Sequence, residues 1–337
     1  MVDRRQFLQL AVFGVMALPL VGCGGPAGSV SKVASETLAV AYPDLQPSLD
    51  PHNWTAPAGP RTFAPLFDAL TFVQNDGQLR PALAVAWSQP NPTTWQFRLR
   101  VDDAKFHNGE MFSPDSVKLT LERLLDPAST LPVRALVSTI DRLDVIDAWT
   151  INIATKAPDR ALARRLSLVY MLPPQYFAQV GEQGFAQHPI GTGFWMLDTF
   201  EPSRRLSLKL FRDTWRGARG EDPPPLSNLE ITVLPQPADR AQALRSRELD
   251  VATALDSASA QALKNAGFAV QTADLGHANR ADFDWETAAF GAPLWSGADV
   301  TATAANVQGV VAEPNGSWWF DRVTKTALQR VAVAGGA

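Results

Sequence analysis

The sequence is poor in the residues that build catalytic and metal sites. It has one cysteine, Cys23, and four histidines among 337 residues. A single cysteine forms no intramolecular disulfide and no cysteine-based metal site. The histidines lack metal-ligand spacing, and there is no Gly-x-Ser-x-Gly turn for a nucleophilic serine. The sequence therefore predicts that the protein is not an enzyme and holds no metal or other cofactor.

Runs of basic residues are missing as well. Thirty Lys and Arg residues stand against 34 Asp and Glu residues, which gives a formal charge of −4, and the basic residues are not clustered. Because binding to phosphate backbones needs a clustered basic surface, nucleic acid is not an expected partner. Hydrophobic residues make up 46% of the chain, which is ample for the core of one large domain or two ordinary ones.

The one long apolar run lies at the start of the chain, at residues 10–21. It is too short to span a bilayer and is typical of a signal-peptide core. The pair Arg4 and Arg5, followed by Gln-Phe-Leu, is similar to a twin-arginine export signal. The alternative is an ordinary charged start to a signal peptide.

Cys23 ends this run in the sequence LVGC. The pattern resembles the lipobox of bacterial lipoproteins, in which a peptidase cuts before the cysteine and the thiol carries a diacylglycerol. The alternative is a chance cysteine. We therefore expect a signal peptide at 1–22, lipid attachment at Cys23 and a tether at 23–35. The protein would lie in the periplasm or cell envelope, anchored to a membrane by about 0.8 kcal/mol per buried methylene.

Hydrophobic periodicity in the rest of the chain predicts a mixed α/β fold. Trp95, Phe97 and Leu99 alternate with polar residues, which is typical of a half-buried strand. A capping serine and a proline predict the start of a helix at Ser113 and Pro114. The same reasoning gives strands at 37–42, 94–101, 205–211 and 229–234, hairpins at 84–101 and 142–154, and helices at 61–73, 113–124, 159–166, 239–247 and 257–266.

Several motifs, in order, resemble family 5 of the bacterial extracellular solute-binding proteins, the peptide-, dipeptide- and nickel-binding subunits of ABC transporters. They include an early loop, a Trp-containing hairpin, the turn before a helix, and a Gly-Thr-Gly return strand. Their residues are SLDPH at 48–52, RPALAVAW at 80–87 with WQFRLR at 95–100, KFHNGEMF at 105–112, HPIGTG at 188–193, RELDVA at 247–252 and NVQGV at 306–310.

The resemblance implies a periplasmic-binding-protein fold of type II with an inserted second lobe and a truncated third lobe. Lobe I would comprise 36–54, 186–270 and 300–325, and lobe II would comprise 55–185. Residues 271–299 would be the remnant of lobe III. Since the family's ligand is trapped between lobes I and III, the short third lobe weakens the expectation of ligand capture.

Four residues are implied as candidates for the ligand cleft because they lie in or near loops that face it in the family: His52, Trp54, Trp195 and Trp295. Core packing is the alternative for each of them. Three other tryptophans stand at strand positions and are expected in the core: Trp87, Trp95 and Trp149.

Two functions stay open. The first is a lipid-anchored solute-binding subunit that presents an oligopeptide-like solute to membrane permease and ATPase subunits. The second is a sensory or protein-interaction lipoprotein that kept the fold and lost ligand capture.

Overall fold

The larger of the two main sheets joins segments from distant parts of the chain. The computed structural model describes residues 36–55, 58–74, 77–216, 225–274, 298–304, 307–308, 311–312, 318–319 and 324–325, all within one unit, residues 33–337. The seven strands of this sheet lie in the order β12-β13-β11-β1-β10-β9-β8. Their bounds are β12 Ala269–Asp274, β13 Ala298–Thr303, β11 Val251–Ala252, β1 Thr37–Tyr42, β10 Asn228–Val233, β9 Arg205–Leu210 and β8 Trp195–Glu201.

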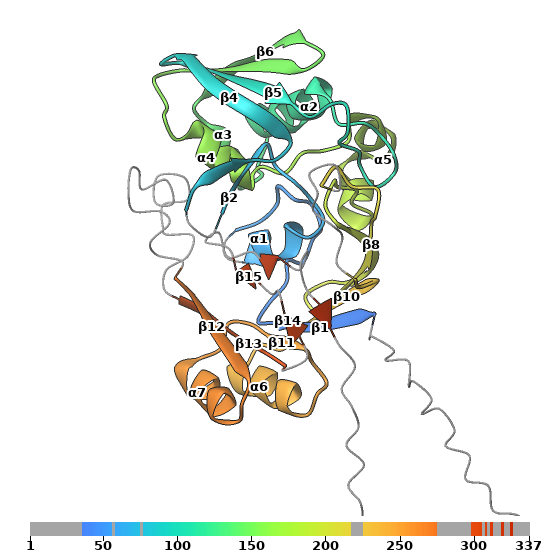
Figure 1. The fold of residues 1–337 in the computed structure, drawn as a ribbon. Helices are drawn as coiled ribbons and strands as arrows, with labels where there is room; N and C mark the ends of the chain where they lie inside the picture. Colours follow the sequence, from blue (N-terminus) through green and yellow to red (C-terminus); the bar gives the residue numbers. More distant parts are fainter. Residues whose placement is uncertain are drawn as a thin grey trace, which may run out of the picture. The chain divides into compact units, whose positions relative to one another are not determined.

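The two faces of this sheet pack against different partners. Leu38 and Val40 of β1 point into the main hydrophobic core. The opposite face carries Ala41, Ala252 and Ala302, whose small side chains admit close packing of helices α6 (Pro237–Arg245) and α7 (Ser257–Asn265). Figure 1 shows these helices side by side next to β11, β12 and β13.

The second main sheet is built within one continuous stretch of chain. Its four strands are antiparallel and lie in the order β4-β5-β7-β6. Trp95, Phe97 and Ile151 point from it into the core, where Val117 and Leu121 of a helix meet them. The elements are β4 Ala84–Asn91, β5 Thr94–Leu99, β6 Ile140–Asp147, β7 Thr150–Thr155, α2 Pro114–Leu125, α3 Arg134–Val137, α4 Leu162–Arg165 and the 3-10 turn η1 Leu166–Leu168.

Shorter elements complete the described chain. They are helices α1 (Ala58–Phe63) and α5 (Pro174–Gln187) and three two-stranded sheets: β2 (Thr71–Val73) with β3 (Leu79–Pro81), β14 (Val307–Gln308) with β17 (Thr324–Lys325), and β15 (Val311–Ala312) with β16 (Trp318–Trp319). The expected fold class is confirmed by this arrangement and by the solved structures described below. The expected boundaries of the three lobes stay a prediction. Strands β12 and β13 belong to the large sheet and cross the expected limits of the lobe III remnant at residues 271 and 299.

The helix predicted at 61–73 is wrong beyond Phe63. Leu66 does not use its carbonyl oxygen for a helical bond, because the N–H of Gly193 donates to it over 3.0 Å. The carbonyl oxygen of Pro65 likewise accepts from the N–H of Trp195 over 3.2 Å. Contacts with a distant segment thus outweigh the local periodicity, and the chain continues into strand β2.

Two further expectations differ from the structure. Helix α5 was not predicted, because its apolar side chains are interrupted by glycines and Gly181 has a φ of +66°. Trp149 was expected in the core, yet it lies in the turn between β6 and β7 with 44% of its surface exposed.

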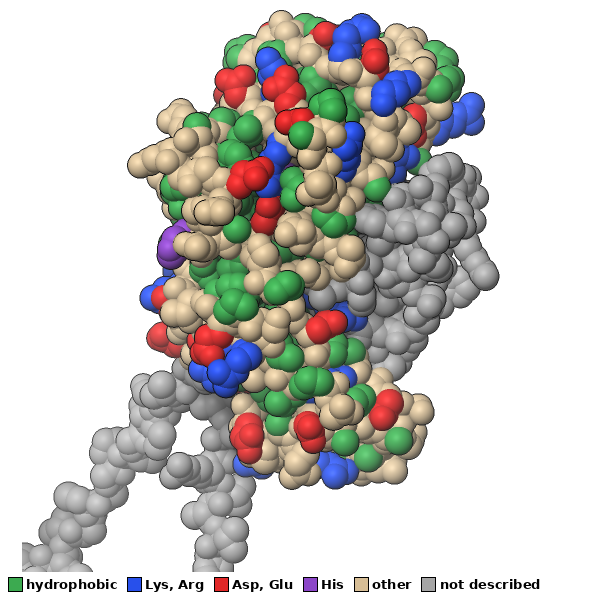
Figure 2. Space-filling model, turned by 180° about the vertical axis from the view of Figure 1, so that it is seen from behind, with side chains coloured by type: hydrophobic (Ala, Val, Ile, Leu, Met, Phe, Trp, Pro, Cys, Tyr) green, Lys and Arg blue, Asp and Glu red, His purple; other side chains and the backbone are tan. Residues whose placement is uncertain are grey.

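The surface also bears on the expected partners. Acidic and basic side chains are interspersed over the face of the described residues seen in Figure 2. None of the helices that the structure describes has the length and apolar character needed to cross a bilayer.

Candidate functional site

The topology of the large sheet directs attention to one edge. β1 pairs in parallel with β10 on one side and with β11 on the other. The carboxyl ends of these three strands, at Tyr42, Val233 and Ala252, therefore lie along the same edge. In open α/β sheets, ligands bind outside the carboxyl ends of strands, where the connections leave in opposite directions. The loops that follow β1, β10 and β11 are the candidate site.

One buried arginine holds two of these loops together. The side chain of Arg240 is 1% exposed. Its guanidinium donates to the carbonyl oxygens of Thr253 at 2.8 Å and Pro235 at 3.0 Å, and also to those of Leu234 and Ala254. A buried charge is tolerated where such acceptors surround it. Arg240 therefore fixes the loops after β10 and β11 relative to each other.

The loop after β11 has a constrained backbone. Ala254 has a φ of +49°, a conformation that alanine adopts at a cost of about 1–2 kcal/mol. The hydroxyl of Thr253 donates to the carbonyl oxygen of Ala41 over 2.9 Å, and the carboxylate of Asp256 accepts from the N–H of Ser259 over 2.7 Å at the start of α7. Neighbouring bonds thus hold the strained residue at the edge where a ligand would bind.

The loop after β1 contributes an accessible carboxylate. Asp44 leaves 49% of its side chain exposed, and one of its oxygens lies 3.7 Å from a guanidinium nitrogen of the buried Arg61. The edge therefore offers a negatively charged acceptor group beside its two clamped loops.

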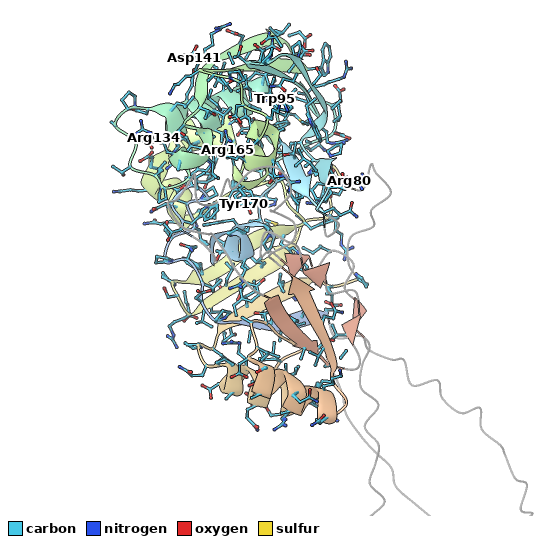
Figure 3. All side chains as sticks on the ribbon, turned by 90° about the vertical axis from the view of Figure 1, so that its left-hand side faces the viewer. Arg80, Trp95, Arg134, Asp141, Arg165 and Tyr170 are labelled. Carbon is cyan, nitrogen blue, oxygen red and sulfur yellow. The ribbon has the colours of Figure 1, made fainter. Side chains whose placement is uncertain are left out.

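Further along this loop, His52 is buried in a polar junction between the two main sheets. Arg123 of α2 donates to its Nδ1 over 3.0 Å, so Nε2 carries the hydrogen and donates to the carbonyl oxygen of Tyr170 over 2.8 Å. Figure 3 places Tyr170 between the two sheets. Burial lowers the pKa of His52 to about 4, helped by the Arg123 charge and opposed by Asp50. The imidazole is therefore neutral at pH 7.

Asp50 completes this junction. Its carboxylate lies 2.6 Å from a nitrogen of Arg123, which also contacts Glu182 at 3.1 Å. Burial alone would raise the pKa of Asp50, but the hydrogen bonds and charge of Arg123, with the N–H and ring of His52, lower it. The junction fixes the early loop to α2 and α5, which is a structural role.

A second junction surrounds the Gly-Thr-Gly motif. The side chain of Asp68 is buried and accepts from Thr192 at 2.9 Å, from the indole of Trp215 at 2.8 Å and from Arg216 at 2.5 Å. A methyl group at Gly191 would lie 2.0 Å from the carbonyl oxygen of Leu66. The motif is thus a close-packed turn.

The candidate cleft residues have mixed outcomes. His52, Trp54 and Trp195 are at most 1% exposed, so a ligand would reach them only after neighbouring groups moved. Their assignment to a cleft stays a prediction, and the buried side chains have packing roles here. Trp295 and the expected lipid site Cys23 lie outside the described residues.

Trp54 and Trp195 differ in one testable respect. The indole N–H of Trp54 donates to the carbonyl oxygen of Pro51 over 2.9 Å, whereas that of Trp195 has no partner among the residues that the structure describes. Both substitutions should lower the free energy of unfolding. We expect the decrease to be about 1–2 kcal/mol smaller for Trp195→Phe than for Trp54→Phe, because only Trp54→Phe removes a buried hydrogen bond. Urea unfolding of both variants measures the difference. Equal costs, or a larger cost at Trp195, would contradict this account.

Sequence reasoning missed Arg240. The sequence pattern that could have indicated it is a charged residue next to Ala241 and Leu244, on the side of a short helix that is buried. Only the long-range pairing of β10 and β11 with β1 shows that it faces four carbonyl groups. Among the described residues, no three His, Cys, Asp or Glu side chains gather in a way that would hold a metal ion.

These features define a class of protein. A parallel edge with two clamped loops, joined to an inserted lobe, is the architecture of a periplasmic-type binding protein. The profile of the family described as "Bacterial extracellular solute-binding proteins, family 5 Middle" matches residues 78–293. The chain belongs to family 5 of the bacterial extracellular solute-binding proteins.

Curated relatives agree with this membership. The chain is 25% identical to the nickel-binding protein NikA of Staphylococcus aureus over 260 residues, which cover 77% of this chain and 48% of that protein. It is 26% identical to the glutathione-binding protein GsiB of Shigella dysenteriae over 211 residues, covering 61% and 39%. The chain thus spans about half the length of the curated relatives it matches, or less.

Solved structures share the fold. The binding protein AgaA of A. tumefaciens R10, in complex with agropinic acid, gives a TM-score of 0.63 at 23% identity and covers 70% of this chain and 47% of its own. DppA of Helicobacter pylori, in complex with the peptide STSA, gives a TM-score of 0.63 at 21% identity, with coverage of 71% and 51%.

Proposed function

We propose that the chain is the solute-binding subunit of a peptide-type ABC transporter and captures an oligopeptide-like solute at the carboxyl-end edge of β1, β10 and β11. The family match carries this proposal, and the loops clamped by Arg240 support the location. Permease and ATPase subunits in the membrane would receive the solute. The solute would bind the closed arrangement of the lobes more tightly than the open one and so shift the population toward it, without covalent chemistry.

Titration calorimetry of the full chain tests solute capture. The panel holds pooled tri- and tetrapeptides, glutathione and nickel with histidine, which represent what related proteins are described as binding. We expect saturable heat with the peptides. A folded chain that gives no heat with any member of the panel would contradict the transport role.

A second function is favoured by one specific observation. The chain is 34% identical over 150 residues to the transcriptional regulator SgrR of Salmonella typhi, a protein in which this sequence type forms part of a larger chain. This supports a sensory role as the alternative to transport, and the full alternative is a sensory or protein-interaction lipoprotein that has lost ligand capture. Absence of heat in the calorimetry, together with a stable fold, is the result this alternative expects.

The proposal includes a lipid anchor at Cys23 and a location in the periplasm or cell envelope. We expect radiolabelled palmitate to be incorporated into the native protein and lost in Cys23→Ala, because only a thiol at the end of the signal peptide accepts the diacylglycerol. Cell fractionation should then find the native protein in the membrane fraction and the variant in the soluble fraction. Label retained in the variant would contradict the anchor.

A further inference from the structure

β6 forms a free edge of the four-stranded sheet. Its only strand partner among the described residues is β7. Figure 1 shows β6 along the border of this sheet, and Figure 3 labels Asp141 there. A strand edge presents unpaired N–H and carbonyl groups that can pair with another strand. The border is therefore a potential association surface.

The two edges of this sheet are not equally available. The opposite edge strand, β4, contains Pro90 and a register shift between Ser88 and Asn91, both of which obstruct pairing. β6 also has register shifts, between Ile140 and Arg142 and between Val145 and Asp147, but the stretch between them pairs regularly with β7 and the strand contains no proline. A new strand would therefore add along this stretch.

Exposed apolar side chains lie at the same edge. Val145, Ile146 and Trp149 leave 45%, 53% and 44% of their surfaces exposed. Trp149 is also held in place, because its N–H donates to Asp147 over 2.8 Å and its indole N–H to Asp102 over 3.3 Å. A fixed aromatic group beside a free strand loses little entropy on association.

The charges of β6 select its partner. Arg142 and Asp144 point to the same side of the sheet and form an exposed ion pair at 3.0 Å. If two β6 strands pair antiparallel with Leu143 opposite Leu143, each Arg142 lies opposite the Asp144 of the other copy. A register shifted by two residues places Asp144 against Asp144, or Arg142 against Arg142. Opposite charges stabilise a cross-strand pair and like charges destabilise it.

We propose that β6 is a self-association edge, at which two copies of this chain pair antiparallel about a two-fold axis at Leu143 and join their four-stranded sheets into one. The axis creates two identical Arg142–Asp144 contacts. The pairing leaves the carboxyl-end edge of the large sheet uninvolved.

Sedimentation velocity of the full chain, carrying Cys23→Ser to prevent lipidation, tests this interface over a wide range of protein concentration. The chain should dimerise reversibly. Arg142→Asp and Asp144→Arg should each raise the dissociation constant roughly tenfold, because each change converts two symmetric attractions into repulsions. The double variant Arg142→Asp/Asp144→Arg restores the opposite charges and should return the constant to within about twofold of the original.

The matched control is Asp198→Lys, which disrupts an exposed ion pair with Lys209 beside the edge strand β8 of the other sheet. It should leave the dissociation constant unchanged, and the circular dichroism of all variants should match the parent. A parent chain that is monomeric at every concentration would overturn the proposal. The proposal would also be overturned if the double variant associated as weakly as the single variants. It would likewise be overturned if only the control variant raised the dissociation constant.

Discussion

Asp68→Ala is expected to lower the free energy of unfolding by about 3–5 kcal/mol, the largest effect of any single substitution considered for this fold. The buried carboxylate accepts hydrogen bonds from Thr192, Trp215 and Arg216. Its removal leaves a buried guanidinium without its counter-charge and two donors without their acceptor. Urea unfolding at neutral pH, followed by far-ultraviolet circular dichroism, measures the change.

The control for this prediction is an ion pair of the same type at the surface. Asp213 lies 2.9 Å from Lys105 and has 72% of its side chain exposed. Because exposed pairs contribute about 1 kcal/mol or less, Asp213→Ala should change the unfolding free energy only slightly. If Asp68→Ala and Asp213→Ala lowered the free energy of unfolding by similar amounts, the junction around the Gly-Thr-Gly turn would not stabilise the fold as its geometry indicates.

The second large effect is a loss of stability in mild acid, caused by two buried histidines. His107 resembles His52 in its bonding: its Nδ1 accepts from the N–H of Gly191 over 3.3 Å and its Nε2 lies 3.1 Å from the carbonyl oxygen of Gly193. Burial lowers the pKa of His107 to about 4, as it does for His52. Both rings are satisfied only in the neutral form.

The direction of the pH effect follows from these pKa values. The unfolded chain binds protons at these histidines below about pH 6.5, whereas the folded chain does so only near pH 4. Stability is therefore complete above pH 6.5 and falls as the pH drops from 6.5 toward 4. Between pH 7.5 and 5.0 each histidine should account for about 2 kcal/mol.

Urea midpoints at these two pH values, for the parent and for His52→Gln and His107→Gln, test the assignment. Each substitution should reduce the difference between the two midpoints. His188, which is exposed, supplies the control, since His188→Gln should leave that difference unchanged. A parent chain equally stable at both pH values would contradict the account of both junctions.

Local patterns predicted the parts of the fold that depend on neighbouring residues. The alternation around Trp95 and Phe97 predicted β5, and both side chains are buried in the core. Gly267 has a φ of +86° just after α7, as expected of a helix end. The ordered motifs, taken together, predicted the family.

What the sequence could not predict depends on residues brought together from far apart. The helix expected at 61–73 ends early because Leu66 bonds to Gly193, more than a hundred residues away. Arg240 acquires its role only when the loops after β10 and β11 meet across β1. The contacts of His52 with Arg123 and with the carbonyl oxygen of Tyr170 likewise depend on distant residues, and its loop motif did not predict them.

The central claim is that the carboxyl-end edge of β1, β10 and β11 binds a peptide-like solute. Hydrogen exchange of the full chain, with and without the pooled tri- and tetrapeptides, tests it most directly. Amide exchange at residues 44–46, at 234 and 236, and at 253–256 should slow together when the peptides are present. Unchanged exchange in all three loops, at peptide concentrations that saturate any calorimetric signal, would contradict the claim.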